Sequence, residues 1–172
     1  MTRPDYSAVW PRGRSTSLSV PDTALHTNLE ISAQRYPDKP CLVYYDACYS
    51  YRQVLEQVQA LAGFLQHDCG VRKGDRVLLY MQNSPQFVLA YYAILRADAV
   101  VVPVNPMNRA DELQHYIRDT EASVIVYGQE LHEYIAVLGQ SAPAHKLVAA
   151  YHDYLPSSGT DLTVPEVVAA PA

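Results

Sequence analysis

The polar residues that follow one predicted strand are the best candidates for chemistry in this sequence. The apolar run Val100–Val104 is followed by Asn105, Pro106, Met107, Asn108 and Arg109. Ligands bind at the carboxyl ends of strands in open α/β sheets, so this polar loop is a candidate binding site. The same residues also suit a rigid strand-to-helix turn, in which Pro106 fixes φ and Arg109 is a solvated residue. The residues by themselves leave both interpretations open.

Other reactive side chains form no catalytic or metal-binding pattern. Cys41, Cys48 and Cys69 match neither a disulfide framework nor a zinc spacing, so we expect free thiols. The six histidines are scattered, and the spacing supports neither a Ser-His-Asp nor a Cys-His arrangement. The glycines form no glycine-rich turn that holds a pyrophosphate. We therefore expect no catalytic residue and no metal ligand in this chain.

Size and charge narrow the functional classes. The chain has 172 residues, enough for about one domain, with 49% hydrophobic and 18% charged residues. Its net charge is -5, and no basic stripe indicates a nucleic-acid partner. No apolar run approaches the ~20 residues needed to span a bilayer. Residues 1–20 lack the apolar centre of a secretory signal, so we expect a cytoplasmic protein.

The hydrophobic pattern predicts an α/β fold with a parallel sheet. From Ser50 onward, helical periods alternate with short apolar runs, which indicates βαβ crossovers with helices on both faces of the sheet. A small N-terminal hairpin precedes them, with strands at 41–45 and 49–51. The remaining predicted strands are 76–81, 100–104, 124–127 and 146–150. The predicted helices begin near Asp22 or Thr23, at Ser50, at Asn83 or Ser84, at Ala110 and at Leu131.

Capping signals and composition set the expected boundaries. Ser50 with Gln53 has the spacing of a capping box, and Pro85 suits the first turn of the third helix. The expected buried stripe of that helix is Phe87, Val88, Tyr91, Tyr92 and Leu95. We expect a flexible arm at 1–21, an α/β subdomain at 22–150 and a linker or peripheral strand at 151–172. Within the arm, Trp10 is a candidate anchor onto this domain or onto a second subunit.

Several motifs resemble the N-terminal part of acyl-CoA synthetases in the adenylate-forming, or AMP-binding, superfamily. They are Gly70-Val71-Arg72-Lys73-Gly74-Asp75-Arg76-Val77, Asn83-Ser84-Pro85-Gln86-Phe87, Val101-Val102-Pro103-Val104-Asn105-Pro106 and the helix around Glu112-Leu113. The similarity covers roughly Leu25 to Val148. One departure is Asp98-Ala99, where the family usually has Gly-Ala, so Asp98 has to adopt a turn that glycine would relax.

The resemblance implies a parent enzyme that uses ATP, Mg²⁺ and coenzyme A to convert a carboxylic acid, favoured here as a medium- or long-chain fatty acid, into its thioester. It also implies that loop 105–109 lies near the nucleotide end of coenzyme A, where Arg109 can pair with a phosphate. The segment Ser158-Gly159-Thr160 is similar to the start of the family's phosphate loop. It lacks the later glycine and lysine, and Asp161 puts a carboxylate where phosphate oxygens would lie.

These features predict an N-terminal fragment of an acid–thiol ligase that is inactive alone and binds none of the three ligands tightly. Apolar surface facing missing sequence favours association, so we expect a homo-oligomer. Two alternatives remain. The chain is either a non-catalytic α/β module for binding or assembly, or a fragment of an enzyme that adenylates an aryl acid or an amino acid.

Overall fold

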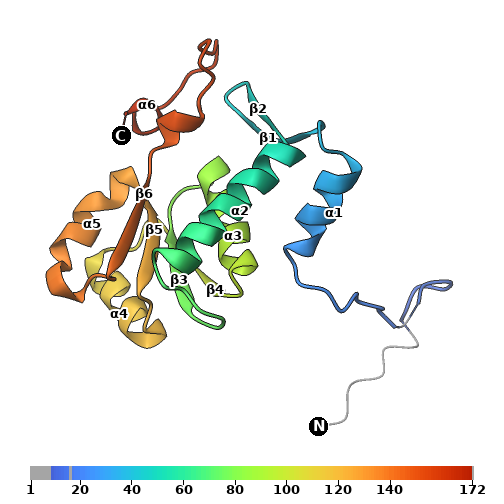
Figure 1. The fold of residues 1–172 in the computed structure, drawn as a ribbon, viewed down its shortest axis with the longest axis horizontal. Coiled ribbons are helices and arrows are strands. Elements are labelled where there is room, and N and C mark those ends of the chain that lie inside the picture. The colour runs from blue at the N-terminus through green and yellow to red at the C-terminus, as the bar shows by residue number, and fades with distance from the viewer. Residues whose placement is uncertain (1–8, 16, 172) are drawn as a thin grey trace, which may run out of the picture.

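The computed structural model describes residues 9–15 and 17–171, and its centre is a four-stranded parallel sheet (Figure 1). The strands are β3 (Arg76–Tyr80), β4 (Val100–Val104), β5 (Val124–Gly128) and β6 (His145–Ala149), in the spatial order β4-β3-β5-β6. In register, Leu78 lies opposite Val102 on one side and Ile125 on the other. The predicted parallel α/β fold is therefore confirmed.

Helices cover both faces of the sheet because its strands carry apolar side chains on both faces. Val77, Leu79 and Val124 belong to a core shared with α2 (Tyr51–His67) and α3 (Pro85–Arg96). On the other face, Leu78, Tyr80 and Ile125 pack with Leu113 and Ile135. Those two residues come from α4 (Ala110–Thr120) and α5 (His132–Val137). The short helices η1 (Gln129–Leu131) and η2 (Gly139–Ser141) flank α5.

The N-terminal hairpin is present, but its turn lies earlier than predicted. β1 (Pro40–Tyr44) pairs antiparallel with β2 (Ala47–Ser50), and Tyr44 lies opposite Ala47. Tyr45 and Asp46 both have positive φ, 45° and 69°, as a two-residue hairpin turn requires. The prediction of a connection at 46–48 and a return strand at 49–51 was therefore wrong by two residues, because a tight turn consumes only Tyr45 and Asp46.

Two helix starts agree with their capping signals. Ser50 caps α2: its Oγ accepts a hydrogen bond from the N–H of Gln53 at 3.3 Å, and the Gln53 side chain accepts from the N–H of Ser50 at 2.8 Å. Ser84, rather than Asn83, caps α3, with its Oγ accepting from the N–H of Phe87 at 3.2 Å. By contrast, α1 (Thr27–Arg35) begins four or five residues later than predicted, and Leu25 stays half exposed.

The predicted buried stripe of α3 was wrong. The buried residues of α3 are instead Pro85, Leu89, Ala90, Ala93 and Ile94. The five residues of the predicted stripe are only half-buried. Helical period allowed either face, and the small alanine side chains decided the outcome because they let α3 lie close to α2 and to the sheet.

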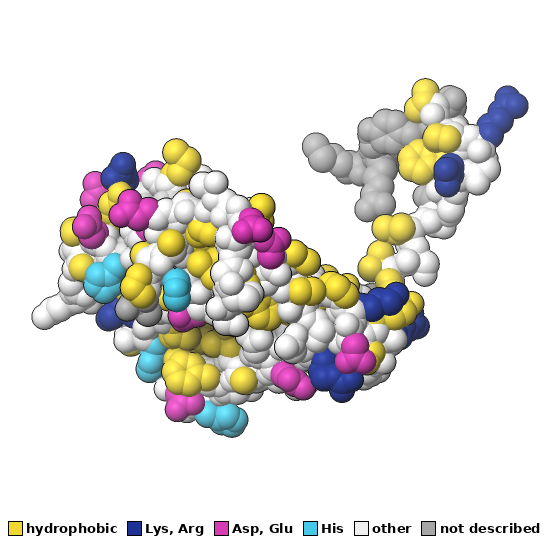
Figure 2. Space-filling model, turned by 90° about the horizontal axis from the view of Figure 1, so that it is seen from above, with side chains coloured by type: hydrophobic (Ala, Val, Ile, Leu, Met, Phe, Trp, Pro, Cys, Tyr) yellow, Lys and Arg dark blue, Asp and Glu magenta, His cyan; other side chains and the backbone are white. Residues whose placement is uncertain are grey.

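The N- and C-terminal segments differ from one another. In Figures 1 and 2 the described residues before α1 extend away from the body, and Trp10 is 46% exposed; residues 1–8 and 16 lie outside the described residues. Residues 151–172, for which we predicted a linker or a peripheral strand, instead contain η3 (Tyr151–Tyr154) and α6 (Glu166–Ala169). Tyr151 and Val168 are buried in the core, so this segment packs on the domain through its own apolar residues.

Candidate functional site

A polar crevice lies at the carboxyl ends of β3 and β4. Its volume is about 250 Å³, and its lining comprises Met81, Gln82, Asn83, Phe87, Pro103, Val104, Asn105 and Pro106. The strands end side by side because they are parallel and in register, with Tyr80 opposite Val104. Each strand then passes directly into a polar turn. The crevice therefore combines amide side chains with one aromatic wall, at the edge of the sheet where α/β proteins bind ligands.

Loop 105–109 is held by hydrogen bonds within itself and from the sheet. The Asn105 side chain accepts from the N–H of Met107 at 2.9 Å, which closes an Asx turn. The Tyr80 hydroxyl donates to the carbonyl oxygen of Asn108 at 2.5 Å, and the Asn108 amide donates to the Tyr116 hydroxyl at 3.1 Å. These bonds make the loop a rigid strand-to-helix turn that still presents Asn105 to the crevice.

Tyr80 is well suited to remain a donor in this position. Its side chain is fully buried, and this burial raises the pKa of Tyr80 to about 12. Smaller contributions from Tyr134 and Glu130 are part of this rise in pKa, and the positive charge of Arg109 opposes it. The hydroxyl is therefore protonated at neutral pH and holds Asn108 in place.

Arg109 is not part of the lining of the crevice. Its guanidinium donates to the Tyr134 hydroxyl at 2.5 Å and lies 5.1 Å from the centre of that ring. Its backbone N–H donates to the Glu112 carboxylate at 2.7 Å. Arg109 remains exposed, so its charge is accessible to an anion from solvent.

The structure thus separates the five residues singled out from the sequence. Asn105 and Pro106 line the crevice, Met107 is exposed, Asn108 faces the two tyrosines, and Arg109 stacks on Tyr134. Sequence reasoning did not place Gln82, Phe87 or Pro103 in the site. The rule that identified Asn105 as a site candidate, a polar residue directly after a predicted buried strand, also applies to Gln82.

The neighbouring crevice, between the ends of β3 and β5, is filled by a tyrosine. The Tyr151 hydroxyl accepts from the N–H of Gln82 at 3.0 Å and donates to the Glu130 carboxylate at 2.9 Å. Burial raises the pKa of Tyr151, which keeps it protonated. A Cβ atom at Gly128 would overlap both the Tyr151 hydroxyl and the Glu130 carboxylate. Because residue 128 is a glycine, Tyr151 and Glu130 can fill the space between the ends of β3 and β5, where the strand order reverses. The crevice between β3 and β4 stays open.

The segment Ser158-Gly159-Thr160 is hydrogen-bonded to the turn of the N-terminal hairpin. The Thr160 hydroxyl donates to the Asp46 carboxylate at 2.6 Å and accepts from the N–H of Leu162 at 3.1 Å. A second carboxylate thus joins Asp161 at this segment, which disfavours a bound phosphate.

Among the described residues, no group of three His, Cys, Asp or Glu side chains is arranged to hold a metal ion. No helix in that part of the chain has both the length and the apolar composition to cross a membrane.

Comparison with known proteins identifies the family. The family described as AMP-binding enzyme matches residues 29–167. This chain belongs to that family. It is 35% identical over 152 residues to a long-chain-fatty-acid–CoA ligase from Bacillus subtilis (strain 168). The alignment covers 88% of this chain but 27% of the ligase, so the chain spans about a quarter of that relative.

Solved structures agree with this assignment. The long-chain-fatty-acid–CoA ligase FadD1 from Archaeoglobus fulgidus superposes with a TM-score of 0.69 at 26% identity, over 77% of this chain and 28% of FadD1. The anthranilate–CoA ligase AuaEII in complex with anthranoyl-AMP gives the same TM-score and identity, over 76% of this chain and 25% of AuaEII. The resemblance to the N-terminal part of acyl-CoA synthetases is confirmed.

Proposed function

We propose that this chain is the N-terminal part of an ATP-dependent fatty-acid–CoA ligase and that its crevice helps to bind the nucleotide end of coenzyme A. The longer protein would use ATP and Mg²⁺ to activate the acid as an acyl-adenylate and would then transfer the acyl group to coenzyme A. The 35% identity to a long-chain ligase supports a fatty acid as the substrate. We also propose a cytoplasmic location for this reaction.

The observation that carries the coenzyme A proposal is that loop 105–109 lines the crevice through Asn105 and Pro106 and also carries the exposed Arg109. Asn105, Gln82 and Asn83 offer amide groups to a nucleotide, and the exposed guanidinium of Arg109, at the end of the same loop as Asn105, suits a phosphate. The carboxylates of Asp46 and Asp161 make the Thr160 segment a poor alternative for phosphates. We propose accordingly that this chain alone neither adenylates an acid nor forms a thioester.

Calorimetric titration with coenzyme A, and separately with ATP and Mg²⁺, tests this proposal. We expect weak coenzyme A binding that Arg109→Ala reduces by about tenfold, the loss of one charge-assisted contact. Arg118→Ala is the matched control, because it removes the same charge near the opposite end of α4. Failure of coenzyme A to bind would contradict the proposed role of the crevice in binding coenzyme A. ATP binding, or pyrophosphate exchange by this chain, would contradict our interpretation of the Thr160 segment.

A second candidate is an aryl-acid ligase. The anthranilate–CoA ligase matches this fold as well as the fatty-acid ligase from Archaeoglobus fulgidus does, so fold similarity favours neither acid. Sequence identity to the Bacillus ligase favours the fatty acid. Thioester formation by the full-length protein with palmitate and with anthranilate, measured side by side, discriminates between the two candidates.

We further propose that the isolated chain self-associates. Several apolar side chains are about half or more exposed, among them Val20, Leu25, Phe64 and Val148. Exposed apolar surface of this kind promotes association. Light scattering across a dilution series tests this, and a monomer at every concentration would contradict it. A non-catalytic assembly module remains the alternative if the chain associates but binds no coenzyme A.

A further inference from the structure

The turn that joins β3 to α3 contributes to the lining of the crevice between β3 and β4. Gln82 and Asn83, in this turn, belong to the lining, and Ser84 follows them as the cap of α3. The ladder between β3 and β5 ends at the pair Tyr80–Tyr127. The N–H of Gln82 therefore lies beyond the last paired residue of the ladder, and its hydrogen-bond acceptor comes from a side chain.

That acceptor is the Tyr151 hydroxyl, whose oxygen lies 3.0 Å from the Gln82 nitrogen. A backbone N–H can only donate and a carboxylate accepts, so a hydroxyl placed between them satisfies both in one arrangement. The Tyr151 oxygen accepts from Gln82, and its proton is donated to Glu130 at 2.9 Å. Burial raises the pKa of Tyr151, so the hydroxyl keeps this proton at neutral pH. Glu130 thereby fixes the direction in which Tyr151 offers its acceptor.

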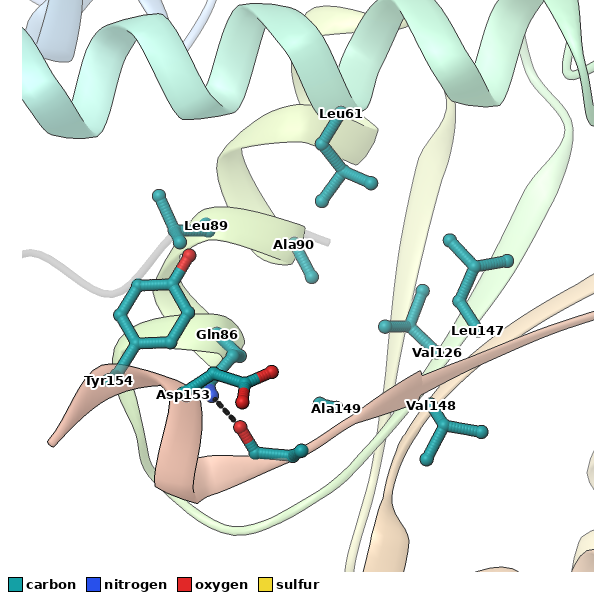
Figure 3. Close-up of a pocket in the computed structure, with 11 residues that line it drawn as sticks. Leu61, Gln86, Leu89, Ala90, Val126, Leu147, Val148, Ala149, Asp153 and Tyr154 are labelled. Atoms are coloured by element: carbon teal, nitrogen blue, oxygen red, sulfur yellow. Dashed lines mark hydrogen bonds between the residues drawn. The ribbon is translucent and has the colours of Figure 1, made fainter. Parts of the chain in front are cut away.

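Tyr151 is itself held in place from both sides. Its side chain is 1% exposed. The carbonyl oxygen of Ala150, the residue before it, accepts from the Gln86 amide at 2.6 Å (Figure 3). At the other end of η3, the carbonyl oxygen of Tyr154 accepts from the Tyr49 hydroxyl at 2.9 Å. The short helix is thus anchored both to α3 and to the hairpin, which makes the Tyr151 hydroxyl a fixed point.

We propose that Tyr151 is a positioning residue for the crevice: its hydroxyl holds the turn 82–84 in the conformation that lines the crevice, and Glu130 orients that hydroxyl. The bond from Tyr151 fixes the start of the turn, and the cap formed by Ser84 fixes its end. Groups that are held in place before a ligand arrives lose less freedom when it binds, which favours affinity. This inference rests on the proposed function, in which the crevice binds coenzyme A.

A matched pair of substitutions separates the hydroxyl from the ring. Tyr151→Phe keeps the ring, and with it the filling of the core, and removes only the hydroxyl. Tyr154→Phe makes the same change three residues later in η3, where the hydroxyl donates to the Gln57 side chain of α2. Neither Tyr154 nor Gln57 belongs to the lining of the crevice, so this variant is the control.

Site-resolved hydrogen exchange of the complete chain is the first measurement. Tyr151→Phe should speed exchange of the Gln82 N–H by about tenfold or more, because this N–H loses its acceptor. Tyr154→Phe should leave the rate within about twofold of the parent protein. Unchanged exchange of Gln82 in Tyr151→Phe, or an equal rise in both variants, would overturn the proposal.

Two substitutions of Glu130 leave Tyr151 in place, so they give an answer even if Tyr151→Phe does not fold. Glu130→Gln should keep the exchange of the Gln82 N–H within about twofold of the parent protein, because an amide oxygen still accepts from the hydroxyl. Glu130→Leu should raise it about threefold or more, because nothing then orients the hydroxyl. Equal exchange rates in the two variants would overturn the role of Glu130.

Calorimetric titration with coenzyme A distinguishes failure of this inference from failure of the proposed function. We expect Tyr151→Phe to weaken binding about three- to tenfold and Tyr154→Phe to leave it unchanged. Equal affinities of the parent protein and Tyr151→Phe, despite faster exchange of Gln82, would overturn the inference and leave the proposed function intact. Absence of binding to the parent protein would contradict the proposed function, and the exchange rates would still decide whether Tyr151 holds the turn.

Discussion

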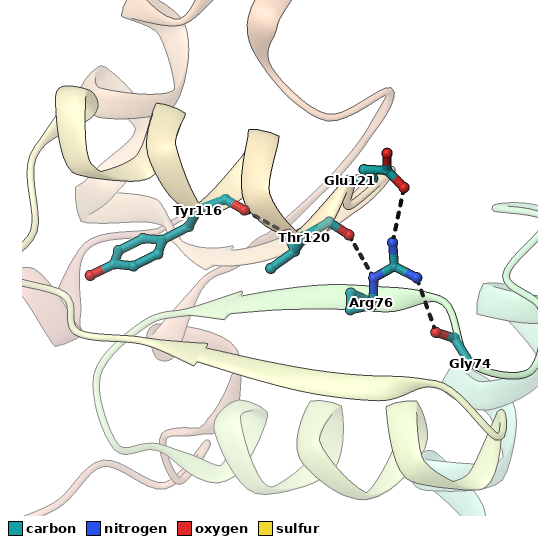
Figure 4. A network of polar contacts seen from close by, with 5 residues as sticks. All are labelled: Gly74, Arg76, Tyr116, Thr120 and Glu121. Atoms are coloured by element: carbon teal, nitrogen blue, oxygen red, sulfur yellow. Dashed lines mark hydrogen bonds and ion pairs between the residues drawn. The ribbon is translucent and has the colours of Figure 1, made fainter.

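The Nε of Arg76, at the start of β3, donates a hydrogen bond of 2.6 Å to the carbonyl oxygen of Thr120, the last residue of α4 (Figure 4). The same guanidinium also donates to the carbonyl oxygen of Gly74 at 3.3 Å and pairs with the Glu121 carboxylate at 3.3 Å. A helix leaves its last carbonyl groups without partners inside the helix, and a cation near that end is favourable. Arg76 therefore joins the end of a helix to the beginning of the central strand.

Arg76→Ala should lower the free energy of unfolding by about 1–3 kcal/mol, because it leaves the Thr120 carbonyl without its charged donor. The ion pair itself adds little, since the Glu121 side chain is 84% exposed. Urea unfolding of the two proteins measures the difference. Arg52→Ala is the control: it removes an ion pair to Asp38 on the surface, and its effect should be within about 0.5 kcal/mol. Equal effects of both substitutions would contradict this role of Arg76.

Gly128→Ala should destabilise the domain by about 1–3 kcal/mol, the usual cost of overpacking. The added Cβ meets the Tyr151 hydroxyl, which is buried and holds the N–H of Gln82. Gly63→Ala is a control of opposite sign. It lies inside α2 with no atom within 4 Å of its added Cβ, so it should stabilise by about 0.5–1 kcal/mol. Thermal unfolding of both variants tests the pair, and a neutral Gly128→Ala would count against the close approach.

Asp98→Gly should stabilise the domain by about 0.5–1 kcal/mol. Asp98 follows α3 with a φ of 58°, in the left-handed region where a side chain costs energy and glycine does not. The turn matters because the carbonyl oxygen of Asp98 accepts from the N–H of Gly74 at 2.9 Å. Asp98→Ala should destabilise instead, since alanine tolerates this conformation less well than aspartate does. Unfolding in urea gives the order, and stabilisation by alanine would contradict the backbone argument.

The raised pKa of Tyr80 predicts loss of stability at alkaline pH. A pKa of about 12 in the folded protein, against 10.0 for the free group, favours the protonated hydroxyl. Its contribution is complete below pH 10 and is lost as the pH rises from 10 to 12. Tyr80→Phe should lower stability at neutral pH by about 1 kcal/mol, because the bond to Asn108 is removed, and should flatten the loss above pH 10.

Urea unfolding of the parent protein and of Tyr80→Phe between pH 8 and about 11.5 checks this. A Tyr80→Phe variant with the same alkaline slope as the parent protein would assign the slope to other tyrosines.

Local signals in the sequence were sufficient to predict the strands of the sheet and the starts of two helices. The apolar runs at 76–80 and 124–128 are buried on both faces, as parallel strands are, and Ser50 with Gln53 forms the capping box that their spacing indicates. The carboxyl end of β4 was also recognisable as a candidate site, because Asn105 and Pro106 follow an apolar strand. These features depend on residues that are close together in the sequence, so they can be predicted without a structure.

Tertiary packing decided the rest. It selected Leu89 and Ala93, rather than Phe87 and Tyr91, as the buried face of α3, because a helix between a sheet and another helix needs small side chains. It brought Gln82 to the crevice beside Asn105, and it used Tyr151 to close the neighbouring crevice. The sequence by itself determined which segments form the layers and which strand ends carry polar loops. Which of those loops remains open to a ligand was decided by contacts between residues as far apart as Gln82 and Tyr151, and such contacts exist only after the chain has folded.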